Sequence, residues 1–217
     1  MSTSHKLIIV AGFAVAMAWV ETSVVVYLRT LYYPDGFAFP LRVIQDNVMA
    51  VELLREMATM VMISLVALLA GRTAWERFAY FALQFGIWDI FYYVWLKASL
   101  GWPASLLDWD ILFLIPVVWT GPVLAPLLVS IVLIVAGLMI VRCTSLGREF
   151  RPGRLSWLLS TIATVVILAS FLSNANAVMR QLMPESYWWS ALTIGLALYG
   201  VAIVLVWRRC LNVAKSS

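Results

Sequence analysis

Six long runs of predominantly apolar residues constrain what this chain can fold into more than any other feature of its sequence. The runs cover residues 7–28, 47–70, 75–98, 123–141, 155–178 and 187–207. Because a helix of about 20 apolar residues crosses the hydrocarbon core of a bilayer, each run is long enough to span a membrane. The sequence therefore predicts an all-α, multi-pass membrane helix bundle of about six transmembrane helices. No Pro-, Gly- or Ser-rich linker divides residues 1–217, so we expect a single transmembrane domain.

The scarcity of charge supports this prediction. Charged residues make up 12% of the chain and hydrophobic residues 64%, and the mean hydropathy is +0.95. About a quarter of the residues of a soluble domain are charged, so this chain has too few charges to cover a soluble surface. Lys6 and the apolar stretch after it have the pattern of a secretory signal. The run continues well past Ala14 to Ala16, so we interpret it as an uncleaved first span.

The stretch between the third and fourth spans is unusual. Residues 111–119 are apolar, but nine residues are too few to cross a bilayer. Pro116, Pro122 and Pro126 disfavour a straight helix that would continue into the next span. We therefore predict a half-helix at about 111–119, either re-entrant or lying at the interface, with Asp108 or Asp110 capping its start.

The distribution of lysine and arginine predicts the orientation of the bundle. Cytoplasmic loops of membrane proteins carry an excess of these residues. One predicted side holds four of them: Arg29, Arg42, Lys97 and Arg180. The other side holds ten: Lys6, Arg72, Arg77, Arg142, Arg148, Arg151, Arg154, Arg208, Arg209 and Lys215. Both termini are therefore expected in the cytoplasm, which in a bacterial cell implies the inner membrane, with the opposite face outside.

Ionisable side chains within the predicted spans are the main functional signal. They are Glu21, Glu52, Arg55, Glu56 and Asp89, and all fall in the outer half of the first three spans. A charge at the centre of a bilayer costs roughly 2.5–3.5 kcal/mol on insertion scales, so such residues usually face the bundle interior and find partners. Glu52 and Glu56 are four residues apart and share one helix face. Negative charge exceeds positive charge in this set, so bound protons or a bound cation would resolve the excess.

The residue types limit which cofactor this cluster suits. His5 is the only histidine, which excludes a bis-histidine haem, and the chain has neither a P-loop nor a GxGxxG motif. We predict no cofactor. The alternative is a hard divalent cation such as Mg²⁺, Ca²⁺ or Mn²⁺, bound by Glu52, Glu56 and Asp89. Cys143 and Cys210 do not form a CxxC motif, so we expect neither a disulfide framework nor a thioredoxin-like site.

Aromatic residues are concentrated near the same outer half, and the chain is tryptophan-rich, with 11 tryptophans. They are interpreted either as an interface belt, which membrane proteins commonly carry, or as a platform for a lipid, a quinone or a partner protein. Tyr92 and Tyr93 lie one turn from Asp89. The residues predicted to bind a ligand or ion are Glu21, Arg29, Glu52, Arg55, Glu56, Asp89, Tyr92, Tyr93, Asp108 and Asp110.

The sequence leaves three functional classes open. It also leaves a structural alternative, in which the carboxylates and arginines form a salt-bridge network that only fixes helix packing. The first class binds or transports a proton, a cation or a small ligand. The second is a membrane subunit or assembly factor that contacts quinone, lipid or a partner protein. The third is an intramembrane enzyme on a lipid-like substrate, with Glu52, Glu56 or Asp89 as acid or base, although no catalytic signature favours it. We expect membrane lipid as a partner and no nucleic acid, and a homo-oligomer stays open.

Overall fold

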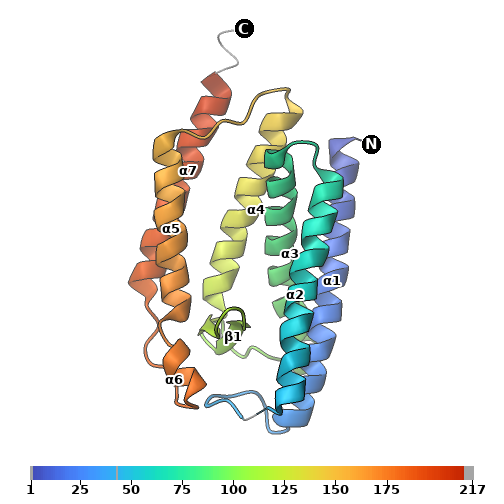
Figure 1. Cartoon of the computed structure of the whole chain (residues 1–217), viewed down its shortest axis with the longest axis vertical. Helices are drawn as coiled ribbons and strands as arrows, with labels where there is room; N and C mark the ends of the chain where they lie inside the picture. Colours follow the sequence, from blue (N-terminus) through green and yellow to red (C-terminus); the bar gives the residue numbers. More distant parts are fainter. Residues whose placement is uncertain (1, 43, 213–217) are drawn as a thin grey trace.

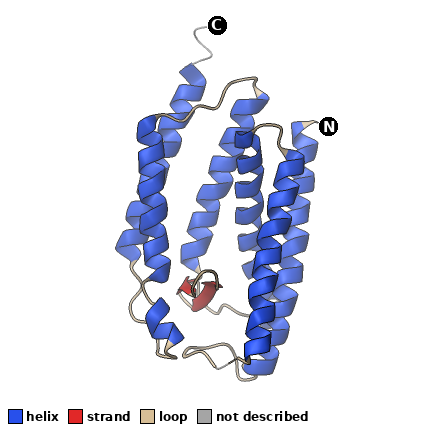
Figure 2. Ribbon diagram, viewed as in Figure 1, coloured by secondary structure: helices blue, strands red, loops and turns tan. Residues whose placement is uncertain are grey.

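Long helices form wherever the sequence carries a long apolar run. The structure is a computed structural model and describes residues 2–42 and 44–212, which form a mostly helical bundle with a small β-hairpin (Figures 1 and 2). The elements in chain order are α1 (Thr3–Tyr32), α2 (Asp46–Ala70), α3 (Ala74–Leu100), β1 (Trp109–Phe113), β2 (Trp119–Pro122), α4 (Leu124–Ser145), α5 (Arg154–Leu172), α6 (Ala175–Met179) and α7 (Trp189–Asn212).

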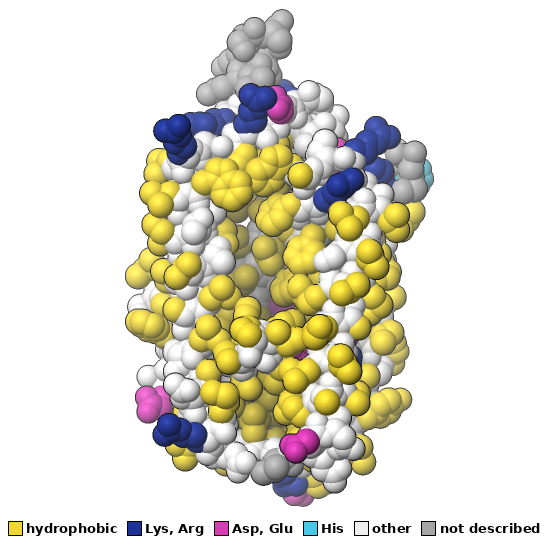
Figure 3. All heavy atoms as spheres, in the orientation of Figure 1, with side chains coloured by type: hydrophobic (Ala, Val, Ile, Leu, Met, Phe, Trp, Pro, Cys, Tyr) yellow, Lys and Arg dark blue, Asp and Glu magenta, His cyan; other side chains and the backbone are white. Residues whose placement is uncertain are grey.

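Five helical stretches are long and apolar enough to cross a membrane. They are α1, α2, α4, the α5–α6 stretch Arg154–Met179, and Trp189–Leu211 in α7. α3 is of similar length, with 27 residues, but is not among these five stretches. Large hydrophobic side chains are exposed along the sides of the bundle, among them Leu69 at 88% and Ile8 at 70%. Figure 3 shows the result: a hydrophobic middle band with the cationic side chains gathered at the two ends.

The chain termini define the two ends of the bundle. α1 begins and α7 ends at the same end, which we call the terminal end (Figure 1). The opposite end, which we call the distal end, carries the loop after α1, the hairpin and α6 (Figure 1). The predicted grouping of cationic residues follows this division, because the α2–α3 and α4–α5 loops with their arginines lie at the terminal end.

Helix boundaries have local causes. The Thr73 hydroxyl accepts a hydrogen bond from the backbone N–H of Glu76 and caps the start of α3. Gly101, with φ of 68°, ends α3 in the left-handed conformation that favours glycine. The predicted fifth span is divided: α5 ends at Leu172, and the polar residues after it separate α5 from the short α6.

Close packing of α3 against α4 depends on two glycines. A Cβ atom at Gly86 would lie 2.6 Å from the Ser130 carbonyl oxygen, and one at Gly137 would lie 2.8 Å from that of Ala79. Small residues let helices approach closely in membranes, where packing rather than the hydrophobic effect drives association. α3 also packs against α1 and α2, while α5 packs mainly against α7. The bundle thus has a larger group, α1 to α4, and a pair, α5 and α7.

The predicted half-helix over 111–119 is wrong. This stretch forms an antiparallel hairpin in which Asp110 pairs with Gly121, Ile111 with Thr120 and Phe113 with Trp119. β-Branched and aromatic residues suit a strand, and Pro116 falls in the connecting turn, where it breaks no ladder. The hairpin satisfies backbone groups between its strands, as non-helical backbone inside a bundle requires.

Neither predicted capping residue caps a helix. Asp108 instead accepts hydrogen bonds from the backbone N–H groups of Ala104 (2.8 Å) and Ser105 (3.1 Å), and so closes a turn before β1. Asp110 lies within β1. At the terminal end, Cys143 of α4 and Cys210 of α7 form a disulfide, a single cross-link between the two helix groups that the sequence analysis did not anticipate.

Candidate functional site

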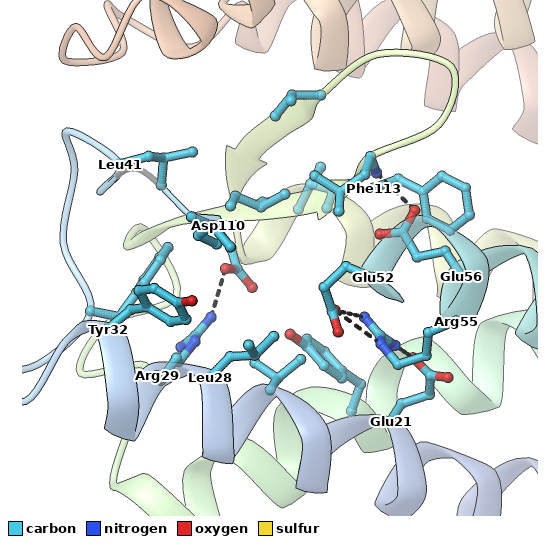
Figure 4. A pocket seen from close by; sticks show the side chains of 18 of the residues that line it. Glu21, Leu28, Arg29, Tyr32, Leu41, Glu52, Arg55, Glu56, Asp110 and Phe113 are labelled. Carbon is cyan, nitrogen blue, oxygen red and sulfur yellow. Dashed lines mark hydrogen bonds and ion pairs between the residues drawn. The ribbon is translucent and has the colours of Figure 1, made fainter. Parts of the chain in front are cut away.

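A cavity of about 180 Å³ lies in the distal half of the bundle, between α1, α2, α3 and the hairpin. It gathers nearly all of the predicted ligand-site residues, and Figure 4 shows how those on α1, α2 and β1 face one another. The predicted residues that line it are Glu21, Arg29, Glu52, Arg55, Glu56, Asp89, Tyr92, Tyr93 and Asp110. Asp108 is not among the lining residues, because its carboxylate closes the neighbouring turn. We call this space the acidic cavity.

Arg55 of α2 is shared by two glutamates. Its Nε and Nη2 atoms donate to Glu52 Oε2 at 3.0 and 2.7 Å, and its Nη1 atom forms an ion pair with Glu21 of α1 (Figure 4). The Thr59 hydroxyl donates a further hydrogen bond to Glu21. Glu21 and Glu52 are buried. One cation thus serves two carboxylates, and the ion pairs tie α1 to α2.

Arg29 of α1 forms the second ion pair, with Asp110 of β1 at 2.7 Å between Nη2 and Oδ1 (Figure 4). Its guanidinium also lies over the rings of Phe37 (4.1 Å) and Trp102 (3.9 Å), a cation–π arrangement. Burial raises the pKa of the Asp110 carboxyl to about 6, and the Arg29 guanidinium opposes this rise. Arg29 therefore pairs with the hairpin, whereas Glu21 pairs with Arg55.

Two further carboxyl groups have no cationic partner within the described part of the chain. Glu56 accepts a hydrogen bond from the backbone N–H of Leu114 (3.0 Å). Asp89 accepts one from the Ser130 hydroxyl (2.8 Å). Neither forms an ion pair with any described residue. Neutral donors alone hold these two groups, which lie on α2 and α3.

Three buried polar atoms that line the acidic cavity have no hydrogen-bond partner among the described residues. They are Arg29 Nη1, Asp110 Oδ2 and Trp88 Nε1. Their residues are at least nine-tenths buried, with exposed fractions of 6%, 1% and 8%. Buried polar atoms in proteins nearly always have a partner, so unpaired ones around a cavity indicate that something fills it, either water or a ligand.

The remaining lining residues were not among the predicted ligand-site residues. One wall of the acidic cavity is formed by the loop after α1, with Tyr33, Phe37, Leu41 and Arg42, and hairpin residues 111–114 form another. No periodicity in the sequence marks these loop positions. Thr59 was missed although a signal existed: it lies four residues after Arg55, on the same face of α2.

The geometry does not support a metal site on the predicted carboxylates. No group of three or more His, Cys, Asp or Glu residues among the described residues is placed to hold a metal ion, and this includes Glu52, Glu56 and Asp89. Glu52 is engaged by Arg55, while Glu56 and Asp89 accept hydrogen bonds from different elements. The acidic cavity is therefore a space lined by carboxyl and aromatic groups, and a hard divalent cation on Glu52, Glu56 and Asp89 stays an alternative prediction.

No family model, curated protein or solved structure matches this chain. The class of protein is therefore defined by the fold, a mostly helical bundle with five helices suited to crossing a membrane. Within this class, the chemistry of the acidic cavity carries the functional argument.

Proposed function

We propose that this chain is a six-span integral membrane protein that binds a small organic cation, of the primary amine class, in the acidic cavity. In this proposal α3 crosses the membrane with the five more apolar stretches, which agrees with termini at one end of the bundle. The excess of Lys and Arg at the terminal end favours termini in the cytoplasm, and the inner membrane in a bacterial cell. The acidic cavity then faces the outer side.

The surplus of carboxyl groups is the observation that carries the proposal. Five carboxyl groups line the acidic cavity, those of Glu21, Glu52, Glu56, Asp89 and Asp110. Two arginines lie among them, and a third lining residue, Arg42, is half exposed. A buried carboxylate without a counter-charge is strongly unfavourable, so the surplus calls for a bound cation or bound protons.

The wall of the acidic cavity favours an organic cation. Trp88, Tyr92 and Tyr93 line it from α3 and Tyr32 from α1. Ammonium groups bind to the faces of such rings, and also donate hydrogen bonds to carboxylates. A cavity of about 150 Å³ holds a molecule the size of benzene. A group of a few heavy atoms therefore fits the acidic cavity.

Titration calorimetry on the protein in nanodiscs tests this proposal. The probe is n-butylamine, which is charged at neutral pH, and n-butanol is the uncharged control. We expect butylamine to bind, butanol to bind at least tenfold more weakly, and Glu56→Gln and Asp89→Asn each to weaken butylamine binding about tenfold, which is about 1.4 kcal/mol. Glu149→Gln, an exposed carboxylate of the α4–α5 loop, is the matched control and should change nothing.

Two results would contradict the proposal. One is butylamine binding that is absent, or that persists unchanged in both Glu56→Gln and Asp89→Asn. The other is tighter binding of Mg²⁺ than of butylamine with the same dependence on these two carboxylates, which would support the divalent cation alternative instead.

A further inference from the structure

A second cavity, of about 220 Å³, lies between the two helix groups of the bundle. Its walls come from α3 and α4 on one side and from α5 and α7 on the other, and they are predominantly apolar, with Phe85, Val129, Leu133, Ile167 and Leu168 among the lining residues. The space-filling view shows a recess at mid-height on the face where this gap lies, surrounded by hydrophobic side chains (Figure 3). We call this space the apolar groove.

The apolar groove continues from the acidic cavity. Trp88, Asp89, Leu112 and Phe113 line both spaces. Asp89 therefore stands at the junction, with its carboxylate held by Ser130 from the side of the groove. Acidic atoms are visible in the depth of the recess in Figure 3. A polar head in the acidic cavity and an apolar chain in the groove can thus belong to one molecule.

Unpaired indole N–H groups border this junction. Trp88 Nε1 and Trp119 Nε1 are buried atoms without a hydrogen-bond partner among the described residues, and Trp119 also lines the groove. Other polar side chains of the groove have partners: the hydroxyls of Thr164 and Tyr199 are hydrogen-bonded to each other at 2.6 Å. A donor without a partner at the boundary between a polar and an apolar space fits an acceptor atom near the head of an amphiphile.

Hydrocarbon is the occupant that suits the groove. The recess lies in the hydrophobic middle band of the bundle (Figure 3), which faces lipid in the proposed membrane arrangement. The charge at its inner end selects among amphiphiles, because the carboxyl surplus of the acidic cavity attracts an ammonium group and repels a phosphate or carboxylate head. An amine with one apolar chain provides both the hydrocarbon that suits the groove and the ammonium group that suits the acidic cavity.

We propose that the acidic cavity and the apolar groove form one binding site for a single-chain amphiphilic amine, with its ammonium group among the carboxylates, its chain in the groove and an acceptor oxygen at Trp88. This inference rests on the proposed function and adds the class of ligand. The chain enters from the bilayer between the helix groups, and the head passes Asp89.

Chain length and a matched pair of α4 variants test the inference. The probes are n-butylamine and n-octylamine, measured by calorimetry in nanodiscs with the heat of empty nanodiscs subtracted. Octylamine is expected to bind at least tenfold more tightly, because four more methylene groups are buried. Val129→Phe, which fills the groove, should remove this gain and leave butylamine binding unchanged. Val135→Phe makes the same change at an exposed position of α4 and should leave both affinities unchanged.

The outcomes separate this inference from the proposed function. Equal binding of butylamine and octylamine, or an octylamine gain that survives Val129→Phe, would overturn the inference and leave the cation site intact. Equal binding of n-octanol and octylamine would instead overturn the proposed function, because charge would then contribute nothing.

The acceptor at Trp88 has its own measurement. 2-Amino-1-octanol carries a hydroxyl next to the amine and is expected to bind at least threefold more tightly than octylamine. Trp88→Phe keeps an aromatic ring and removes the N–H donor, so it should abolish this difference. A difference that persists in Trp88→Phe, or that is absent in the unchanged protein, would remove the acceptor from the proposed site.

Discussion

At the scale of single residues, the arginines decide how the acidic cavity is held together. The sequence predicted that carboxylates from three spans meet at one depth, because their positions along successive helices agree. It did not predict the partners. Arg29 pairs with Asp110, 81 positions away, and Arg55 bridges α1 and α2. Such choices depend on the positions of the hairpin and of neighbouring side chains, which no local pattern encodes.

Removing the shared cation should destabilise the bundle. Arg55→Gln leaves Glu21 and Glu52 buried without their counter-charge, and we expect it to lower the free energy of unfolding by about 3 kcal/mol. Denaturation of the protein in mixed micelles by sodium dodecyl sulfate measures this change. Arg151→Gln, which breaks the exposed pair with Glu149, is the control and should lower it by less than about 1 kcal/mol. Equal effects of the two changes would show that the Arg55 ion pairs contribute nothing to stability.

Binding of a cation should also depend on pH through Asp110. Burial raises the pKa of this carboxyl to about 6, with Arg29 opposing the rise, so the group gains a proton as the pH falls through that value. Asp89, Tyr92 and Tyr93 of α3 line the same cavity, and a hydrogen bond from Tyr93 also opposes the rise in the pKa of Asp110. Since the neutral form attracts a cation less, competition with one proton predicts about tenfold weaker butylamine binding at pH 5 than at pH 7. Calorimetry at the two pH values measures the ratio.

Two results would refute this assignment. One is an affinity that is the same at both pH values. The other is an unchanged pH dependence in Asp110→Asn, which would show that another carboxyl group of the acidic cavity causes the pH dependence.

At the scale of elements, the six long runs predicted the helices well and the short run poorly. The predicted second span, 47–70, begins one residue after α2 begins. Both end at residue 70, because Gly71 and the polar residues after it end the helix. Residues 111–119 form strands. A short apolar run does not distinguish a strand from a helix by periodicity, and length alone favoured neither here. The hairpin exists because its backbone groups pair with each other and because its side chains close both cavities, which is a property of the assembled bundle.

The glycines of α3 and α4 provide a test of how closely these elements pack. Gly86→Ala places a methyl group against the Ser130 carbonyl oxygen, where backbone must shift, so we expect a loss of about 1–3 kcal/mol in the free energy of unfolding. Gly12→Ala in α1 has open space around its added methyl group and should leave stability unchanged or slightly raised. Unfolding in mixed micelles compares the two. A loss of stability in Gly12→Ala that matches that of Gly86→Ala would mean that interhelical contact is not the cause.

At the scale of the whole molecule, two features bear on orientation and oppose each other. The excess of Lys and Arg at the terminal end favours the proposed placement of that end in the cytoplasm. The Cys143–Cys210 disulfide lies at the same end, and cytoplasmic thiols are normally kept reduced. Since many loop charges support one orientation and a single cross-link opposes it, we keep the cytoplasmic assignment. In the proposed orientation, the Cys143–Cys210 disulfide would form only when the protein leaves the reducing compartment.

Cysteine alkylation decides this point. In cells quenched rapidly with acid, then denatured and treated with a maleimide, we expect Cys143 and Cys210 both to be alkylated without prior reduction. After extraction into an oxidising buffer, the same treatment should label neither cysteine. A disulfide already present in the quenched cells would place the terminal end outside and reverse the orientation of the acidic cavity.

The recess between the helix groups determines which ligand concentration governs binding, that in the lipid or that in the aqueous phase. Its opening lies within the hydrophobic band, so the amphiphilic amine proposed above would reach it by lateral diffusion in the leaflet (Figure 3). Occupancy is then set by the mole fraction of the amphiphile among the lipids, and diluting the aqueous phase leaves it nearly unchanged. Two membranes with the same dissolved amine but different lipid composition would load this protein to different extents, which makes the bilayer the reservoir that governs binding.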